Sequence, residues 1–191
     1  MSFKKWAATG VAAVVAGFVV VGLANADEEL SFRVEGATAY MSGVIDSDAP
    51  DLVEELLEDN PKLKEIVLVE VPGSADDVAN LEAALMVREA GLTTRLTKDS
   101  MVASGGTDFF LAGKKRIVAK GAQIGVHSWA DSDGQTGAEA PKDDPMHQHY
   151  LEYYRSIGIQ EAFYWYTLEA APADDVHWMT SSEIKRYQIA N

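Results

Sequence analysis

Residues 101–129 read MVASGGTDFFLAGKKRIVAKGAQIGVHSW, and this stretch contains the pattern that decides the fold. Ser104 precedes a glycine pair and an apolar run that is typical of a helix, and His127 closes an apolar run that is typical of a strand. A basic turn and a second short apolar run separate the two. The stretch therefore predicts helix, turn and strand, with one serine and one histidine at element ends.

On both sides of this stretch, strand-like and helix-like segments alternate at short spacing. Residues 65–71 and 92–97 are short runs typical of strands, and residues 49–61 and 78–91 have apolar side chains at helical spacing. Such alternation favours right-handed βαβ units. The expected fold class is α/β, with a mostly parallel sheet built from repeated ββα and βαβ units and with flanking helices.

The two flanks of the chain complete this picture. Residues 31–45 predict one or two strands, with Gly36 and Gly43 as breaks. The aromatic-rich residues 150–170 predict a helix, or a helix pair broken near Gly158. A final helix is expected to start at Thr180 or Ser181.

The first 26 residues have the pattern of a signal peptide. Lys4 and Lys5 precede an apolar run over residues 6–23, and small residues at Ala24 and Ala26 form a cleavage site. We expect cleavage after Ala26, a domain over residues 27–191, and a periplasmic or secreted protein. An uncleaved signal anchor, which would attach the protein to the membrane, is the alternative, because the apolar run is nearly long enough to span a bilayer.

Composition excludes several classes of protein. The chain has 191 residues and no cysteine, so it has neither a disulfide framework nor a lipoprotein anchor. After removal of residues 1–26, 14 basic residues face 30 acidic ones, a net charge near −16. Such a surface repels nucleic acid and anionic lipid.

Ser104 and His127 are a candidate nucleophile and its base. A serine hydroxyl is a poor nucleophile until a base takes its proton, and histidine suits that task. Gly105, at the start of the helix, would donate its N–H to a developing oxyanion. The turn in VPGSAD (residues 71–76) follows another parallel strand and should lie at the same edge of the sheet, where ligands bind in open α/β sheets. Taken singly, a serine before glycines is more often a helix cap, and a strand-end histidine is more often structural.

Four segments together resemble the proteolytic subunit of the Clp protease, within the wider fold shared with crotonases and signal peptide peptidase A. They are YMSGVI, IVLVEVPGSADD, the stretch from Ser100 to Ser128, and HWMTSSEIKRYQI, and the resemblance spans residues 40–189. It implies that Ser104 is the nucleophile and His127 the general base. It also implies an oxyanion hole formed by the amides of Gly105 and of the turn Gly73–Ser74, although Ser74 stands where the family has a glycine.

The acid partner implied by the resemblance is less well defined. The strict register places Val176 at its position, and Asp175 and Asp174 lie just before it. We assign Asp175, with Asp174 or a Ser–His dyad without an acid as the alternatives. Relatives of the signal peptide peptidase type use lysine as base, and Lys98 and Lys120 are present, but His127 matches better.

Other motifs have simpler explanations. His147 and His149 do not share a helix face and lack further ligands, so no metal site is expected. The segment DSDG is wrongly spaced for a calcium loop, and residues 130–145 are expected to form a polar loop or a lid. The aromatic side chains of residues 150–166 are typical of a core or subunit interface.

The sequence therefore predicts an exported serine peptidase that acts by acyl transfer on a peptide or protein, without a cofactor. The resemblance also implies a homo-oligomer. A catalytically inactive binding or scaffold protein of the same fold is the alternative. Acyl-CoA chemistry fits poorly, because an exported protein meets little acyl-CoA and an acidic surface repels its phosphates.

Overall fold

The computed structural model describes residues 29–131 and 133–191, so the predicted signal segment lies outside the described residues. Its strands are β1 (Ser31–Glu35), β2 (Thr38–Ser42), β3 (Glu65–Val71), β4 (Thr93–Ala103), β5 (Lys115–Val118), β6 (Gln123–Val126) and β7 (His177–Trp178). Its helices are α1 (Ala49–Asp59), α2 (Asp77–Glu89), α3 (Gly105–Leu111), α4 (Pro145–Ile157), α5 (Glu161–Ala170) and α6 (Ser181–Arg186).

All of these strands belong to one sheet of order β1-β2-β3-β4-β6-β7, with β5 paired to the first part of β4. The pairs β2–β3, β3–β4, β4–β5 and β4–β6 are parallel, and the outer pairs β1–β2 and β6–β7 are antiparallel. This arrangement confirms the predicted α/β class with a mostly parallel sheet and flanking helices.

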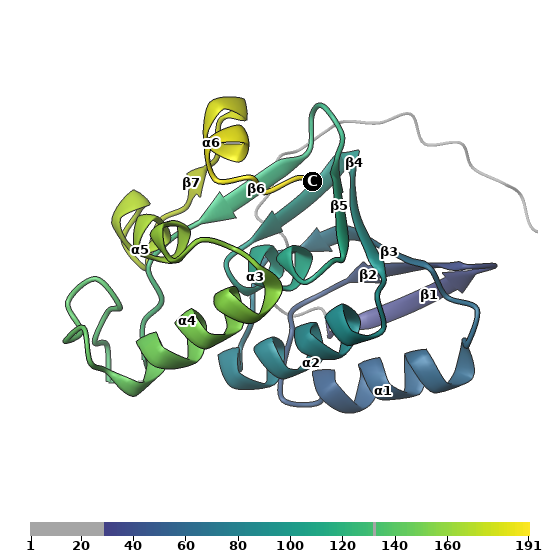
Figure 1. Ribbon diagram of the computed structural model, residues 1–191. Helices are drawn as coiled ribbons and strands as arrows, with labels where there is room; N and C mark the ends of the chain where they lie inside the picture. Colours follow the sequence, from purple (N-terminus) through teal and green to yellow (C-terminus); the bar gives the residue numbers. More distant parts are fainter. Residues whose placement is uncertain (1–28, 132) are drawn as a thin grey trace, which may run out of the picture.

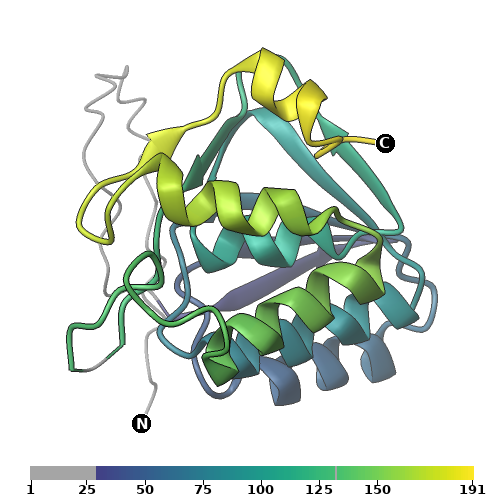
Figure 2. The same cartoon turned by 60° about the vertical axis from the view of Figure 1, so that its left-hand side comes forward.

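The helices α1 to α5 lie on one face of the sheet, and α5 and α4 lie in front of α3 and α2 (Figures 1 and 2). All residues of α3 are buried, because this short helix fills the space between the sheet and the outer helices. Phe109, Phe110 and Leu111 are fully buried there and belong to the main hydrophobic core. The start of α3 at Gly105 is therefore held in place by dense core packing on one side.

Strand β4 is longer than the sequence predicts, and its length positions the site. Its first part, up to Leu96, pairs with β5, and its last part, Met101–Ala103, pairs with β6. The register with β3 shifts between these parts, where Ser100 Oγ donates to the Leu68 carbonyl at 2.6 Å. Because β3, β4 and β6 are parallel neighbours, their carboxyl ends meet at one edge.

Two boundaries of the C-terminal helices agree with the sequence patterns, and one differs. Gly158 adopts a left-handed φ of 78° and separates α4 from α5, which confirms a helix pair. Thr180 caps α6 in a capping box with Glu183. Helix α4 starts at Pro145, earlier than expected, because Asp144 caps it by accepting the N–H of Met146.

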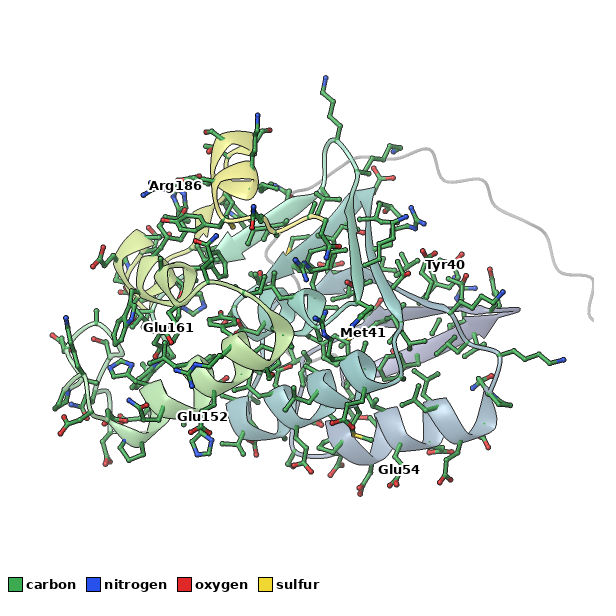
Figure 3. The ribbon with its side chains drawn as sticks, in the orientation of Figure 1. Tyr40, Met41, Glu54, Glu152, Glu161 and Arg186 are labelled. Atoms are coloured by element: carbon green, nitrogen blue, oxygen red, sulfur yellow. The ribbon has the colours of Figure 1, made fainter. Side chains whose placement is uncertain are left out.

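Acidic side chains project outward from the helical layer. Figure 3 shows Glu54 on α1 directed away from the body of the molecule, and Glu152 on α4 and Glu161 on α5 are exposed as well. Their exposure is consistent with a solvated acidic surface.

Candidate functional site

Ser104 joins the end of β4 to the start of α3 in an unusual backbone conformation. Its φ is 52° and its ψ is −130°, a region that L-residues rarely adopt, and its side chain makes no capping hydrogen bond. Its carbonyl accepts the N–H groups of Thr107 and Asp108 and so starts the helix. The half-buried hydroxyl therefore lies at a strand–helix junction and has no hydrogen-bond partner among the described residues. Strain of this kind costs about 1–3 kcal/mol and is typical of functional sites.

The glycine pair after Ser104 is required by packing. A Cβ on Gly105 would lie 2.1 Å from Ser74 Oγ, and one on Gly106 would lie 2.1 Å from the Val71 carbonyl oxygen. The first turn of α3 therefore sits directly against the end of β3. Asn80 of α2 fixes the same turn, because its Nδ2 donates to the Gly105 carbonyl at 3.0 Å.

The turn Gly73–Ser74 lies beside Ser104, as the shared sheet edge predicted. A Cβ on Gly73 would lie 3.4 Å from Ser104 Cβ. Ile45 N–H donates to the Gly73 carbonyl, and Ser74 Oγ donates to Asp77, so both residues of the turn are held. Within residues 29–131 and 133–191, the N–H groups of Gly105 and Ser74 have no hydrogen-bond acceptor. These two amides are available to a ligand oxygen.

His127 follows β6 and lines the same cavity as Ser104. Its Nδ1 lies 2.7 Å from the Ser128 carbonyl, which has no proton to give, so Nδ1 is the donor. In the neutral ring, Nε2 then carries the lone pair that a general base needs. No hydrogen bond joins Ser104 and His127 in the described part of the chain; such bonds often tighten only when substrate binds.

The predicted acid, Asp175, is not brought to His127. Its exposed carboxylate accepts the N–H of Val176, and Asp174 is exposed as well. The Ser128 carbonyl, rather than a carboxylate, orients the His127 imidazole.

The lysines considered as alternative bases also lie apart from the cavity. Lys98 is exposed and pairs with Asp99, and Lys120 is exposed near a turn. Neither lines the cavity that contains Ser104 and His127.

Asp108 is a carboxyl of the site that the sequence analysis missed. It lies one helical turn after Ser104, lines the same cavity and is 7% exposed. Tyr154 donates its hydroxyl proton to Asp108 Oδ1. Burial raises the pKa of Asp108 to about 7, in spite of the opposing Tyr154 hydrogen bond. The spacing of four residues from Ser104 was the available signal, because residues i and i+4 share one helix face.

The remaining motifs have structural roles in the described residues. His147 is buried against Trp129, Tyr164 and Trp165, whereas His149 is exposed. No group of three side chains suited to a metal occurs in the described ranges. Much of the aromatic set lies in the core, and the lid role of residues 130–145 stays a prediction. No helix in the described part combines the length and the hydropathy needed to cross a membrane.

Comparison with known proteins relates this geometry to a fold. No family model and no curated protein sequence matches the chain. Among solved structures, it is similar to a serine-to-alanine mutant of the 1510-N membrane-bound stomatin-specific protease, with 17% identity, a TM-score of 0.56, and coverage of 80% of this chain and 75% of that one. A lysine-to-alanine mutant of the same protease in complex with a substrate peptide has 16% identity, a TM-score of 0.53, and coverage of 83% and 75%.

A putative enoyl-CoA hydratase from Streptomyces coelicolor A3(2) is also similar. Its identity is 12% and its TM-score 0.53, and the match covers 92% of this chain and 70% of that chain. At such low identities, likeness shows the fold alone. The chain has the Clp/crotonase-like fold.

Proposed function

We propose that the protein is an exported serine peptidase or related hydrolase that acts by acyl transfer on peptides. The observation that carries this proposal is the placement of Ser104. Ser104 lies at a strained strand–helix junction and lines a cavity with His127, and the amides of Gly105 and Ser74 have no hydrogen-bond acceptor within the described residues. A nucleophile, a base and oxyanion donors are the groups that acyl transfer needs.

The proposed reaction proceeds in two halves. His127 Nε2 takes the hydroxyl proton as Ser104 Oγ forms a bond to the substrate carbonyl carbon. The amides of Gly105 and Ser74 hold the oxyanion, and Nε2–H then protonates the leaving amine as the C–N bond breaks. Water attacks the acyl-serine after losing a proton to Nε2, and the return of that proton to Ser104 Oγ releases the acid.

Because the Ser128 carbonyl, and not a carboxylate, orients His127, we expect a slow enzyme. A backbone carbonyl fixes the imidazole tautomer but carries no full negative charge to stabilise an imidazolium. The proposal is therefore a Ser104–His127 dyad, and Asp175 enters it only if the loop before β7 rearranges.

A peptide is the favoured substrate class. One similar structure holds a substrate peptide, although that protein is only 16% identical to this chain. The alternative is a binding or scaffold protein of the same fold. Two observations support it: Ser104 and His127 share no hydrogen bond in the described residues, and Asp175 lies away from His127. Acyl-CoA chemistry is a third class, and a thioester hydrolysis assay tests it directly.

Labelling with a fluorophosphonate probe tests the proposal. The protein from Asp27 onward should label, and Ser104→Ala and His127→Ala should each abolish labelling. Ser47→Ala and His149→Ala change an exposed serine and an exposed histidine, and both should label normally. A folded protein that does not label at any pH between 5 and 9 would leave the binding protein as the better account.

A further inference from the structure

The cavity beside Ser104 and His127 is small. Its volume is about 20 Å³. A buried water needs roughly 10–15 Å³, so the cavity accepts only a small group, of the size of a water molecule or a methyl group. Asp108 and Thr167 line it together with a set of tyrosines.

The aromatic wall of this cavity is held in place by packing and hydrogen bonds. Tyr150 stacks on Tyr164 with ring centroids 5.2 Å apart, and the Tyr164 hydroxyl is hydrogen-bonded to His147 Nδ1. Tyr154 donates to Asp108, and Tyr154 and Tyr164 are each 1% exposed. Widening the cavity requires moving buried, hydrogen-bonded rings, and each bond lost without replacement costs about 1–3 kcal/mol.

We infer that this cavity receives the side chain of the residue whose carbonyl Ser104 attacks, and that it restricts that residue to glycine, alanine or serine. The inference rests on the proposed function and adds its substrate class. An alanine methyl fills the available volume. Valine, leucine and phenylalanine exceed it, so their peptides would hold the carbonyl away from Ser104 Oγ and the two amides.

The polar lining explains why serine belongs to the accepted set. A serine side chain places a hydroxyl close to the Asp108 carboxyl, which can accept its proton in a hydrogen bond. Larger apolar side chains are excluded by volume.

Peptidyl phosphonate diphenyl esters test the inference, because they react with an activated serine and carry one defined side chain at the reacting position. We expect the alanine ester to inactivate the protein at least about tenfold faster than the valine, leucine or phenylalanine ester of the same peptide. Thr167→Ala removes two atoms from the cavity wall and should reduce the alanine-to-valine ratio several-fold. Thr136→Ala, in the loop outside the cavity, should leave that ratio unchanged.

The fluorophosphonate carries no amino-acid side chain, so it tests the activated serine separately from the preference of the cavity for small residues. A protein that reacts with the fluorophosphonate, and reacts with the leucine or phenylalanine ester as fast as with the alanine ester, overturns the small-residue inference and leaves the hydrolase standing. A protein that reacts with none of the probes overturns both.

Discussion

At the scale of single residues, Ser104 combines a nucleophilic side chain with a backbone conformation that glycine adopts more readily. Because the φ of 52° is strained, Ser104→Gly relieves that strain and Ser104→Ala retains it. Both variants lack the hydroxyl, so the difference between their free energies of unfolding reports the backbone strain alone. We expect the glycine variant to be more stable than the alanine variant by about 1 kcal/mol in urea unfolding, although glycine usually costs stability.

Ser47 supplies the control for this comparison. It is exposed and its φ is not positive, so Ser47→Gly should be no more stable than Ser47→Ala. An alanine variant at position 104 that equals or exceeds the glycine variant would show that the junction is unstrained.

Asp108 makes stability depend on pH in a direction opposite to most carboxylates. Its pKa is raised by burial from the usual 3.8 to about 7, so the folded state binds its proton more tightly than the unfolded state. The resulting stabilisation is complete below about pH 4 and is lost as pH rises through 7. Between pH 5 and pH 8 the loss is roughly 2–3 kcal/mol, from 1.36 kcal/mol per pKa unit.

Asp108→Asn should remove this pH dependence of the stability, since asparagine is neutral at every pH and its Oδ1 still accepts the hydrogen bond from Tyr154. Urea unfolding at pH 5 and pH 8 measures the effect: the variant should lose less stability over this range than the native protein. Asp143→Asn, at an exposed position, should behave like the native protein. Equal pH dependence in the Asp108 variant would mean that this carboxyl ionises normally.

At the scale of elements, the first turn of α3 fits against the end of β3 with no room for a side chain. In Gly105→Ala the new Cβ would meet Ser74 Oγ at 2.1 Å and Ser74 Cβ at 2.6 Å. We expect destabilisation of about 1–3 kcal/mol, and loss of at least about nine-tenths of fluorophosphonate labelling because both oxyanion amides move.

A second change tests the cause of that loss. Ser74→Gly removes the two nearest atoms that the new Cβ meets and leaves Asn80 Nδ2 at 2.9 Å, so the double variant should regain part of the stability and labelling. Gly106→Ala is the matched control, because its Cβ would meet the Val71 backbone and Ser74→Gly offers no relief. Equal rescue of both alanine variants would contradict the packing argument.

At the scale of the whole molecule, the sequence predicted the α/β class and the mostly parallel sheet, and it offered a helix pair broken near Gly158 as one of two alternatives, because these depend on local periodicity and turn residues. It predicted a common sheet edge for Ser104 and His127, since parallel strands share an edge; that the strands before them, β4 and β6, are neighbours came from the structure. It did not reveal Asp108, whose burial depends on α4 and α5 packing over α3. Nor did it show that the Ser128 carbonyl would be the hydrogen-bond partner of the imidazole.

Export and assembly remain predictions at this scale. The protein expressed with its first 26 residues should be released into the periplasm with Asp27 as its first residue, as N-terminal sequencing would show. Ala26→Leu should block this cleavage, whereas Leu23→Ile, before the cleavage site, should not. A membrane-bound product of unchanged length in the native protein would favour the anchor, and light scattering of the released form would test the predicted homo-oligomer.

The most direct test of the central claim is to locate the fluorophosphonate adduct by mass spectrometry of the digested protein. The account predicts a single adduct on Ser104, at one per chain, that disappears in His127→Ala. An adduct on another residue, or a folded protein without any adduct, would contradict the assignment of Ser104 as nucleophile.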